Sequence, residues 1–152
     1  MSNCFKSSKD IVDELPALSD FLINAGTYYA HLPKQNNVVP KETLEEHINL
    51  VNDYAIRLIE VHQLDEVIDK LIVNYLQNAD DKTANYLKKL FINTIVFHDY
   101  GKTNEFFQVE KMKNLWFRDL CPGNSPIGST HSALGAYIYL TKHLHEIAIE
   151  YS

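Results

Sequence analysis

One short stretch brings several reactive side chains together at the end of an apolar run: Ile95-Val96-Phe97-His98-Asp99-Tyr100-Gly101-Lys102. Upstream of it, apolar residues recur at every third or fourth position, which predicts a largely buried helix over residues 81–100. Glycine commonly follows the last turn of a helix, so Gly101 marks its expected end. The pattern therefore places an imidazole, a carboxylate and an ammonium group at one helix terminus.

The His98-Asp99 pair has the chemistry of a metal site. Successive helical residues diverge by about 100°, so the two side chains can address one point only near a helix end or from a distorted turn. Imidazole nitrogen and carboxylate oxygen are both suitable ligands for a divalent ion. Lys102 follows Asp99 by three positions and can pair with it or with a bound phosphate. The alternative is a hydrogen-bonded His-Asp pair without a metal, because the dipeptide alone is a weak motif.

A second histidine lies on another predicted helix. Thr43-Leu44-Glu45-Glu46 has the form of a capping box, so a helix is expected to begin there and to run to about residue 62. His47 lies on the apolar stripe of this helix, three residues after Leu44 and four before Val51, and it therefore points inward. An inward histidine is either a core residue or a ligand, and spacing alone leaves both interpretations open.

A third histidine, His131, follows the turn-rich segment 119–128 and lies in the first turn of a further predicted helix. Small residues at Ala133, Gly135 and Ala136 permit that helix to approach another closely. A neutral imidazole at a helix start is a reasonable ligand, because the positive end of the helix disfavours its protonation. The alternative is an ordinary histidine of the capping region.

Taken in order, these motifs resemble those of the HD metal-dependent phosphohydrolases. More narrowly, the chain looks like the HD nuclease domain of the type I CRISPR nuclease-helicase, and the resemblance covers residues 31–137. The residues that carry it are Leu44-Glu45-Glu46-His47-Ile48, His98-Asp99-Tyr100-Gly101-Lys102, Phe106-Phe107-Gln108 and His131-Ser132-Ala133-Leu134-Gly135-Ala136. The resemblance implies an all-α fold, an HD-domain helical bundle.

The resemblance also implies a site and a substrate. His47, His98 and Asp99 would bind one divalent ion, and Asp99 with His131 would help to bind a second, with Mn, Mg, Ni or Co as candidate metals. Asp99 and Lys102 would be the catalytic residues, Lys102 stabilising either the phosphate or Asp99. Two ions about 4 Å apart can clamp a phosphodiester and activate water. The implied substrate is single-stranded DNA displaced by a CRISPR surveillance complex, with a helicase domain or subunit as partner.

The chain departs from this family at its carboxyl end. The downstream histidine pair and later aspartate that complete the family's metal sites have no counterparts before Ser152, and the helicase portion is missing too. We therefore expect residues 1–152 to be a single HD-type nuclease domain, either the front part of a longer protein or a shortened form with an incomplete site. Two alternatives follow: an HD phosphohydrolase acting on nucleotides, and a non-catalytic interaction module.

Basic and aromatic residues follow the His-Asp motif. Lys111 and Lys113 lie near Trp116 and Phe117, a combination that can hold single-stranded nucleic acid. The two lysines are accordingly expected to bind substrate together with Lys102. The alternative is that the aromatic residues are core or rim residues with solvated lysines between them, since aromatic stripes are usually packing.

Composition sets the remaining limits. A length of 152 residues suits one domain, and a net charge of −6 argues against a broad nucleic-acid platform but not against a small metal-centred site. Cys4 and Cys121 lie far apart without metal-finger spacing, which favours reduced thiols in a cytoplasmic protein. Neither a membrane-spanning apolar run nor the apolar core of a signal peptide is present in the sequence, so no membrane partner is expected.

The remaining pattern is helical throughout. Residues 9–24 read as a helix interrupted at Pro16, and residues 64–76 read as another, so that about six helices are expected in all. Strand-like alternation is absent. His31 is interpreted as a loop histidine packed by tyrosines, and the histidines interpreted as structural or surface residues are His62, His143 and His145.

Overall fold

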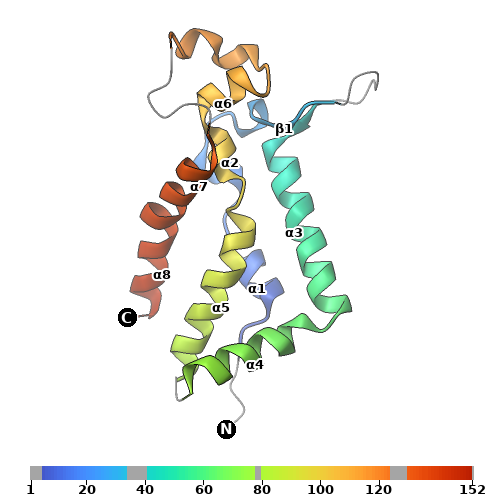
Figure 1. Cartoon of the computed structure of the whole chain (residues 1–152), viewed down its shortest axis with the longest axis vertical. Coiled ribbons are helices and arrows are strands. Elements are labelled where there is room, and N and C mark those ends of the chain that lie inside the picture. Colours follow the sequence, from blue (N-terminus) through green and yellow to red (C-terminus); the bar gives the residue numbers. More distant parts are fainter. Residues whose placement is uncertain (1–4, 34–40, 78–79, 124–129, 152) are drawn as a thin grey trace. The chain divides into compact units, whose positions relative to one another are not determined.

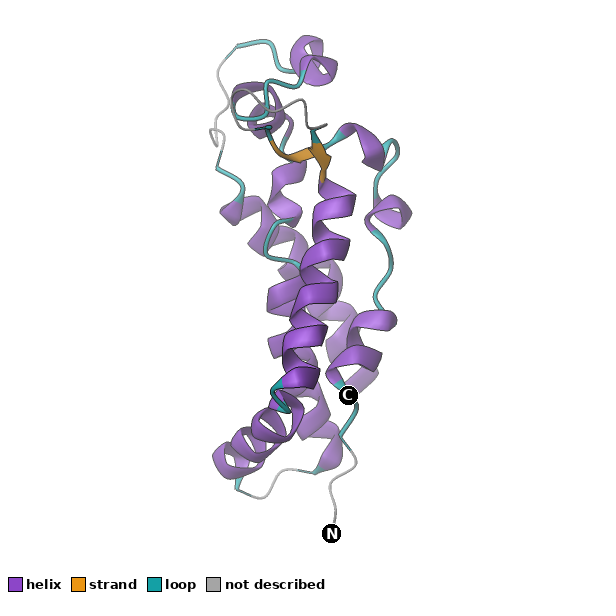
Figure 2. Ribbon diagram, turned by 90° about the vertical axis from the view of Figure 1, so that its right-hand side faces the viewer, coloured by secondary structure: helices purple, strands orange, loops and turns teal. Residues whose placement is uncertain are grey.

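The structure is a computed structural model that describes residues 5–33, 41–77, 80–123 and 130–151. Helices make up most of it, which confirms the all-α class, and Figure 2 shows one short sheet among them. The sequence gives no sign of this sheet, because its strands are too short for alternation to be detected. Among these residues, every helix is too short or too polar to cross a membrane.

The chain divides into two compact units. The first combines Met1–Leu15, Val51–Val96 and Leu140–Ser152. Its elements are α1 (Ser8–Asp13), the part of α3 (Leu44–Val61) from Val51 onward, α4 (Leu64–Leu76), α5 (Asp81–Val96) and α8 (Leu144–Tyr151). Helices α1 and α4 both pack against α5, as Figure 1 shows.

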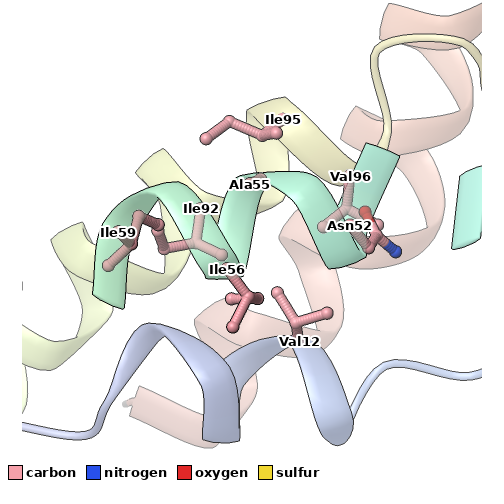
Figure 3. Close-up of a pocket in the computed structure, with 8 residues that line it drawn as sticks. All are labelled: Val12, Asn52, Ala55, Ile56, Ile59, Ile92, Ile95 and Val96. Atoms are coloured by element: carbon pink, nitrogen blue, oxygen red, sulfur yellow. The ribbon is translucent and has the colours of Figure 1, made fainter. Parts of the chain in front are cut away.

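The apolar core of the first unit is built from one stripe on each of three helices. Ile11, Ile59 and Ile92 are its buried centre and come from α1, α3 and α5. Figure 3 shows Val12 and Ile56 with these helices around one small cavity. Its volume is about 10 Å³, near the lower limit for one water molecule, so it is a packing gap rather than a ligand site.

A buried ion cluster also ties the first unit together. The side chain of Lys88 is only 1% exposed, and its Nζ lies 2.7 Å from Asp69 Oδ1 and 3.0 Å from Asp65 Oδ1. The hydroxyl and the backbone N–H of Ser8 donate to the same Asp65 carboxylate. A buried ammonium requires such partners, because an unpaired buried charge is strongly destabilising. The cluster therefore links α1, α4 and α5.

The second unit combines Pro16–Leu50 and Phe97–Tyr139 and consists of short elements. In chain order, its elements besides the start of α3 are α2 (Leu18–Phe21), η1 (Ala25–Thr27), β1 (Tyr29–His31), β2 (Glu42–Thr43), η2 (Tyr100–Thr103), α6 (Glu105–Glu110), η3 (Leu115–Leu120) and α7 (Ser132–Ile138). A π-helical segment, η4 (Tyr139–His143), follows α7. Strands β1 and β2 are antiparallel and place His31 opposite Glu42.

Gln108 joins β1 to the turn η2. Its side chain is fully buried, and its amide group both accepts from the Tyr29 N–H (2.9 Å) and donates to the Tyr29 carbonyl (2.9 Å). The same amide donates to the Lys102 carbonyl at 2.7 Å and accepts from Asn114 Nδ2 at 3.1 Å. Gln108 thus supplies the partners that the edge of such a short strand would otherwise lack.

Several helix ends correct or confirm the sequence-based expectations. Helix α5 ends at Val96 rather than at residue 100. Asn104, and not Thr103, caps α6, since Asn104 Oδ1 accepts from the N–H groups of Phe106 (3.0 Å) and Phe107 (3.4 Å). The predicted interruption near Pro16 is confirmed, because α1 and α2 are separate helices on either side of it.

Candidate metal centre

The predicted ligands of the second unit gather around Asp99. Its side chain is 10% exposed, and its Oδ2 lies 2.9 Å from His47 Nε2 and 3.1 Å from His98 Nε2. Its Oδ1 lies 3.8 Å from His131 Nε2. Residues that are up to 84 positions apart in the chain (131 − 47) therefore surround one carboxylate.

The capping box brings His47 to this point. The Thr43 N–H donates to the Glu46 carboxylate at 2.9 Å, and the Glu46 N–H donates back to Thr43 Oγ1 at 3.2 Å. The helix start is also tied to the chain before β1, because the Leu44 N–H donates to the Tyr28 carbonyl at 2.8 Å. His47 consequently lies in the first turn of α3, with a side chain that is 15% exposed.

His98 and Asp99 lie in tight turns beyond the end of α5. The Tyr100 N–H donates to the Phe97 carbonyl at 3.2 Å, and the Lys102 N–H donates to the Asp99 carbonyl at 2.9 Å. These are bonds over three residues rather than over four, so the chain has left α-helical geometry. As the sequence predicts, this distorted turn allows the adjacent side chains of His98 and Asp99 to meet, with His98 Nε2 3.1 Å from Asp99 Oδ2.

His131 is positioned by an unusually close approach of α7 to η2. A Cβ atom at Gly101 would lie only 1.6 Å from the carbonyl oxygen of His131, and one at Gly135 would lie 3.2 Å from the Gly101 nitrogen. The Gly135 N–H donates to that same His131 carbonyl at 2.9 Å. Glycine at position 101 is therefore needed for space, in addition to the helix-ending role that the sequence indicates.

Lys102 sets the electrostatics of the centre. Its side chain is 9% exposed, and its Nζ lies 2.9 Å from Asp99 Oδ2 and 3.5 Å from the Ala30 carbonyl. Burial raises the pKa of Asp99, but the hydrogen bond and charge of Lys102, aided by His98 and His47, outweigh burial and hold that pKa below its usual range. Asp99 is accordingly a carboxylate at neutral pH and can bind a cation.

Comparisons with protein families, with characterised proteins and with solved structures found no match to this chain.

The donor set fits a divalent ion. His47, His98 and Asp99 each offer a ligand atom, and these atoms all lie within 4.8 Å of one another. Imidazole nitrogen with carboxylate oxygen suits manganese, nickel, cobalt or zinc. Among the ion pairs of the described residues, only that with His131 involves Asp99 Oδ1. A second ion on that side would therefore have fewer ligands from the described residues than the first ion has.

A neighbouring cluster of side chains escaped the sequence analysis. His31, Glu42 and His47 form a second group whose ligand atoms lie within 4.8 Å of one another. Burial lowers the pKa of His31, and the neighbouring Lys102 and His47 side chains lower it further. The group depends on the pairing of β1 with β2, which no local sequence pattern reveals. The interpretation of His31 as a loop histidine was therefore wrong, because it lies in a strand.

The predicted substrate-binding lysines lie on the surface. Lys111 follows α6 and is exposed, while Lys113 has a positive φ of 49° and its Nζ donates to the Glu110 carbonyl at 2.7 Å. Within the described interactions, neither lysine contacts Asp99, so their role stays a prediction. Of the nearby aromatic side chains, Phe117 is 3% exposed and packs inward, whereas Trp116 is 63% exposed.

Proposed function

We propose that this chain is an HD-type, metal-dependent phosphodiesterase that cleaves single-stranded DNA. The observation that carries the proposal is the convergence of His47 Nε2 and His98 Nε2 on Asp99 Oδ2, at 2.9 and 3.1 Å. The His-Asp dipeptide alone is a weak motif, whereas His47 brings a third group from a distant helix to the same carboxylate oxygen. The motif order described above supports the same assignment.

Each residue has a distinct role in this proposal. His47, His98 and Asp99 hold the first divalent ion, and His131 faces the other oxygen of Asp99, 3.8 Å away, where a second ion would bind. Bound divalent ions would polarise the phosphodiester and lower the pKa of an attacking water. Lys102 keeps an ammonium group next to Asp99, from which it can donate to a phosphate oxygen.

The choice of DNA as substrate rests on the resemblance and on the exposed Trp116. An exposed aromatic side chain near Lys111 and Lys113 offers a stacking surface with basic neighbours. The proposal further includes a cytoplasmic setting, delivery of displaced single-stranded DNA by a CRISPR surveillance complex, and cooperation with a helicase domain or subunit.

The test is cleavage of circular single-stranded DNA with added Mn²⁺, compared with excess chelator. We expect cutting only with the metal, and a loss of at least a hundredfold in His98→Ala and in Asp99→Asn. His98→Ala should disturb the fold less than Asp99→Asn does, because the His98 side chain is 42% exposed and that of Asp99 is 10% exposed. Asp99→Asn keeps an oxygen that can accept from Lys102. His62→Ala, at an exposed histidine of the first unit, is the matched control and should cut like the unmodified chain.

Other outcomes reject this function and select an alternative. Metal-dependent turnover of nucleotides without DNA cutting would identify a nucleotide phosphohydrolase. Binding of Mn²⁺ without hydrolysis of either substrate would identify a non-catalytic module. DNA cutting that persists in both His98→Ala and Asp99→Asn would show that the activity comes from elsewhere, including a contaminating nuclease.

A further inference from the structure

The ring of His47 faces two carboxylates from opposite edges. Its Nε2 lies 2.9 Å from Asp99 Oδ2, and its Nδ1 lies 3.4 Å from Glu42 Oε1. A neutral imidazole carries one proton and one free lone pair, so it can donate to only one of the two carboxylates. Since a metal binds along the lone pair in the ring plane, an ion on Nε2 and an ion on Nδ1 would occupy different places.

His31 completes a group of ligands on the Nδ1 side. Its Nε2 lies 4.0 Å from Glu42 Oε2, and its ring packs edge-on against that of His47 with centroids 4.7 Å apart. Tetrahedral zinc, with bonds of about 2.0–2.1 Å, separates its ligand atoms by roughly 3.4 Å. Glu42 thus offers one carboxylate oxygen to each histidine, at 3.4 Å and 4.0 Å, and side-chain rotation would bring the three ligands onto one ion.

We infer that His31, Glu42 and Nδ1 of His47 form a second cation site that takes zinc or a similar late transition metal. Two imidazoles and one carboxylate are a set of ligands that zinc proteins use with a fourth position left open. The side chain of His31 is 55% exposed and that of Glu42 is 31% exposed, so the ion can enter from solvent. The pairing of β1 with β2 fixes these two residues opposite each other.

The two centres share one histidine and therefore exclude each other. An ion held by Nδ1 leaves the proton of the neutral ring on Nε2, which removes His47 as a ligand for the Asp99 centre. Zinc binds such ligands more tightly than manganese does. Zinc on Nδ1 is therefore expected to prevent His47 from binding manganese at the Asp99 centre. This consequence rests on the proposed function, whereas the existence of the zinc site does not.

Zinc binding to a chain without the Asp99 centre tests the site. The double variant His98→Ala/Asp99→Asn removes two ligands of that centre and retains His31, Glu42 and His47. By isothermal titration calorimetry with Zn²⁺, we expect it to bind one equivalent, and to lose at least tenfold in affinity when Glu42→Gln or His31→Ala is added. His62→Ala, added instead, should leave the affinity unchanged. No binding to the folded double variant, or affinity indifferent to Glu42→Gln, would overturn the inference.

A second measurement on the unmodified chain keeps the test independent of variants. In side-chain ¹H–¹⁵N spectra, the first equivalent of Zn²⁺ should shift the ring signals of His31 and move the His47 proton to Nε2. If His31 does not respond while His98 does, zinc binds only at the Asp99 centre and the inferred site is rejected. Both readouts are independent of DNA cleavage, so a failed nuclease assay would not decide them.

Discussion

Gly101 and His131 are in backbone contact so close that no side chain fits between them. A Cβ at position 101 would lie 1.6 Å from the His131 carbonyl oxygen and 2.6 Å from the Gly135 nitrogen. The atoms in the way belong to the backbone, so they cannot move aside as a flexible side chain would. The contact therefore determines where α7 begins and where His131 lies relative to Asp99.

Gly101→Ala should consequently be one of the most damaging small substitutions in the chain. Overpacking costs about 1–3 kcal/mol and occasionally more, and we expect the upper end of that range here, with weakened binding of any ion that uses His131. Gly135→Ala, with its nearest contact at 3.2 Å, should cost less. Gly26→Ala is the matched control, because no atom lies within 4 Å of its added Cβ. Urea unfolding that ranks the three variants differently would contradict this interpretation.

Gln108→Met should destabilise the second unit. The apolar side chain keeps the volume but removes the Gln108 hydrogen bonds to three backbone groups, of Tyr29 and Lys102, and to one N–H of the Asn114 amide, which keeps its bond to the Thr27 carbonyl. Each stranded buried group costs about 1–3 kcal/mol, so a loss of roughly 3 kcal/mol or more is expected by urea unfolding.

Gln108→Glu provides the complementary test at the same position. Only its protonated form can donate, through its single O–H, to either the Tyr29 or the Lys102 carbonyl, so the pKa of the introduced carboxyl should be raised in the folded chain. A raised folded pKa gives stability that is present at low pH and lost as pH rises. Gln108→Glu should therefore be more stable relative to the unmodified chain at pH 4 than at pH 8, and the reverse order would contradict the hydrogen-bond assignment.

The Ser8–Asp65 contact should appear in the pH dependence of stability. Burial raises the pKa of Asp65, but the hydrogen bond from Ser8 and the ion pair with Lys88 outweigh it and lower that pKa below its ordinary 3.8. A depressed folded pKa gives stability that is present above the unfolded pKa and lost as pH falls through the folded one. Ser8→Ala should cost about 1–2 kcal/mol at pH 7 and progressively less towards pH 2.

A double-mutant cycle isolates that contact. In an Asp65→Asn background the group no longer titrates, so Ser8→Ala should have a smaller effect that is constant across the acidic range. Unfolding monitored by circular dichroism at several pH values provides the comparison. An effect of Ser8→Ala that is equally large in both backgrounds would show that the hydroxyl acts through something other than Asp65.

Trp116 should report DNA binding directly. It is the single tryptophan of the chain and its side chain is 63% exposed. Stacking with a base should quench its fluorescence, and Trp116→Ala should weaken binding of a single-stranded oligonucleotide by about 1–3 kcal/mol. Trp116→Phe should retain most of the affinity. Leu120→Ala, at another exposed apolar residue of η3, is the matched control, and equal losses in Leu120→Ala and Trp116→Ala would argue against stacking.

Local patterns in the sequence were sufficient for much of the helical framework. The capping box at Thr43 and Glu46 is confirmed, and α4 spans Leu64–Leu76 as its apolar spacing predicts. Helix ends were less accurate: α5 stops at Val96 instead of residue 100, and an asparagine rather than the preceding threonine caps α6. These differences arise because several residue types can cap or end a helix equally well.

By itself, the sequence predicted which side chains gather around Asp99, because local patterns and motif order picked out His47, His98, Lys102 and His131. Only the tertiary structure decided what lies beside them. Glu42 and His31 meet through strand pairing, Gln108 holds that strand by two hydrogen bonds to Tyr29, and Gly101 admits the backbone of α7. The physical reason is that helix periodicity and capping act over three or four residues, whereas strand pairing, buried hydrogen bonds and backbone contacts join positions that lie far apart in the chain.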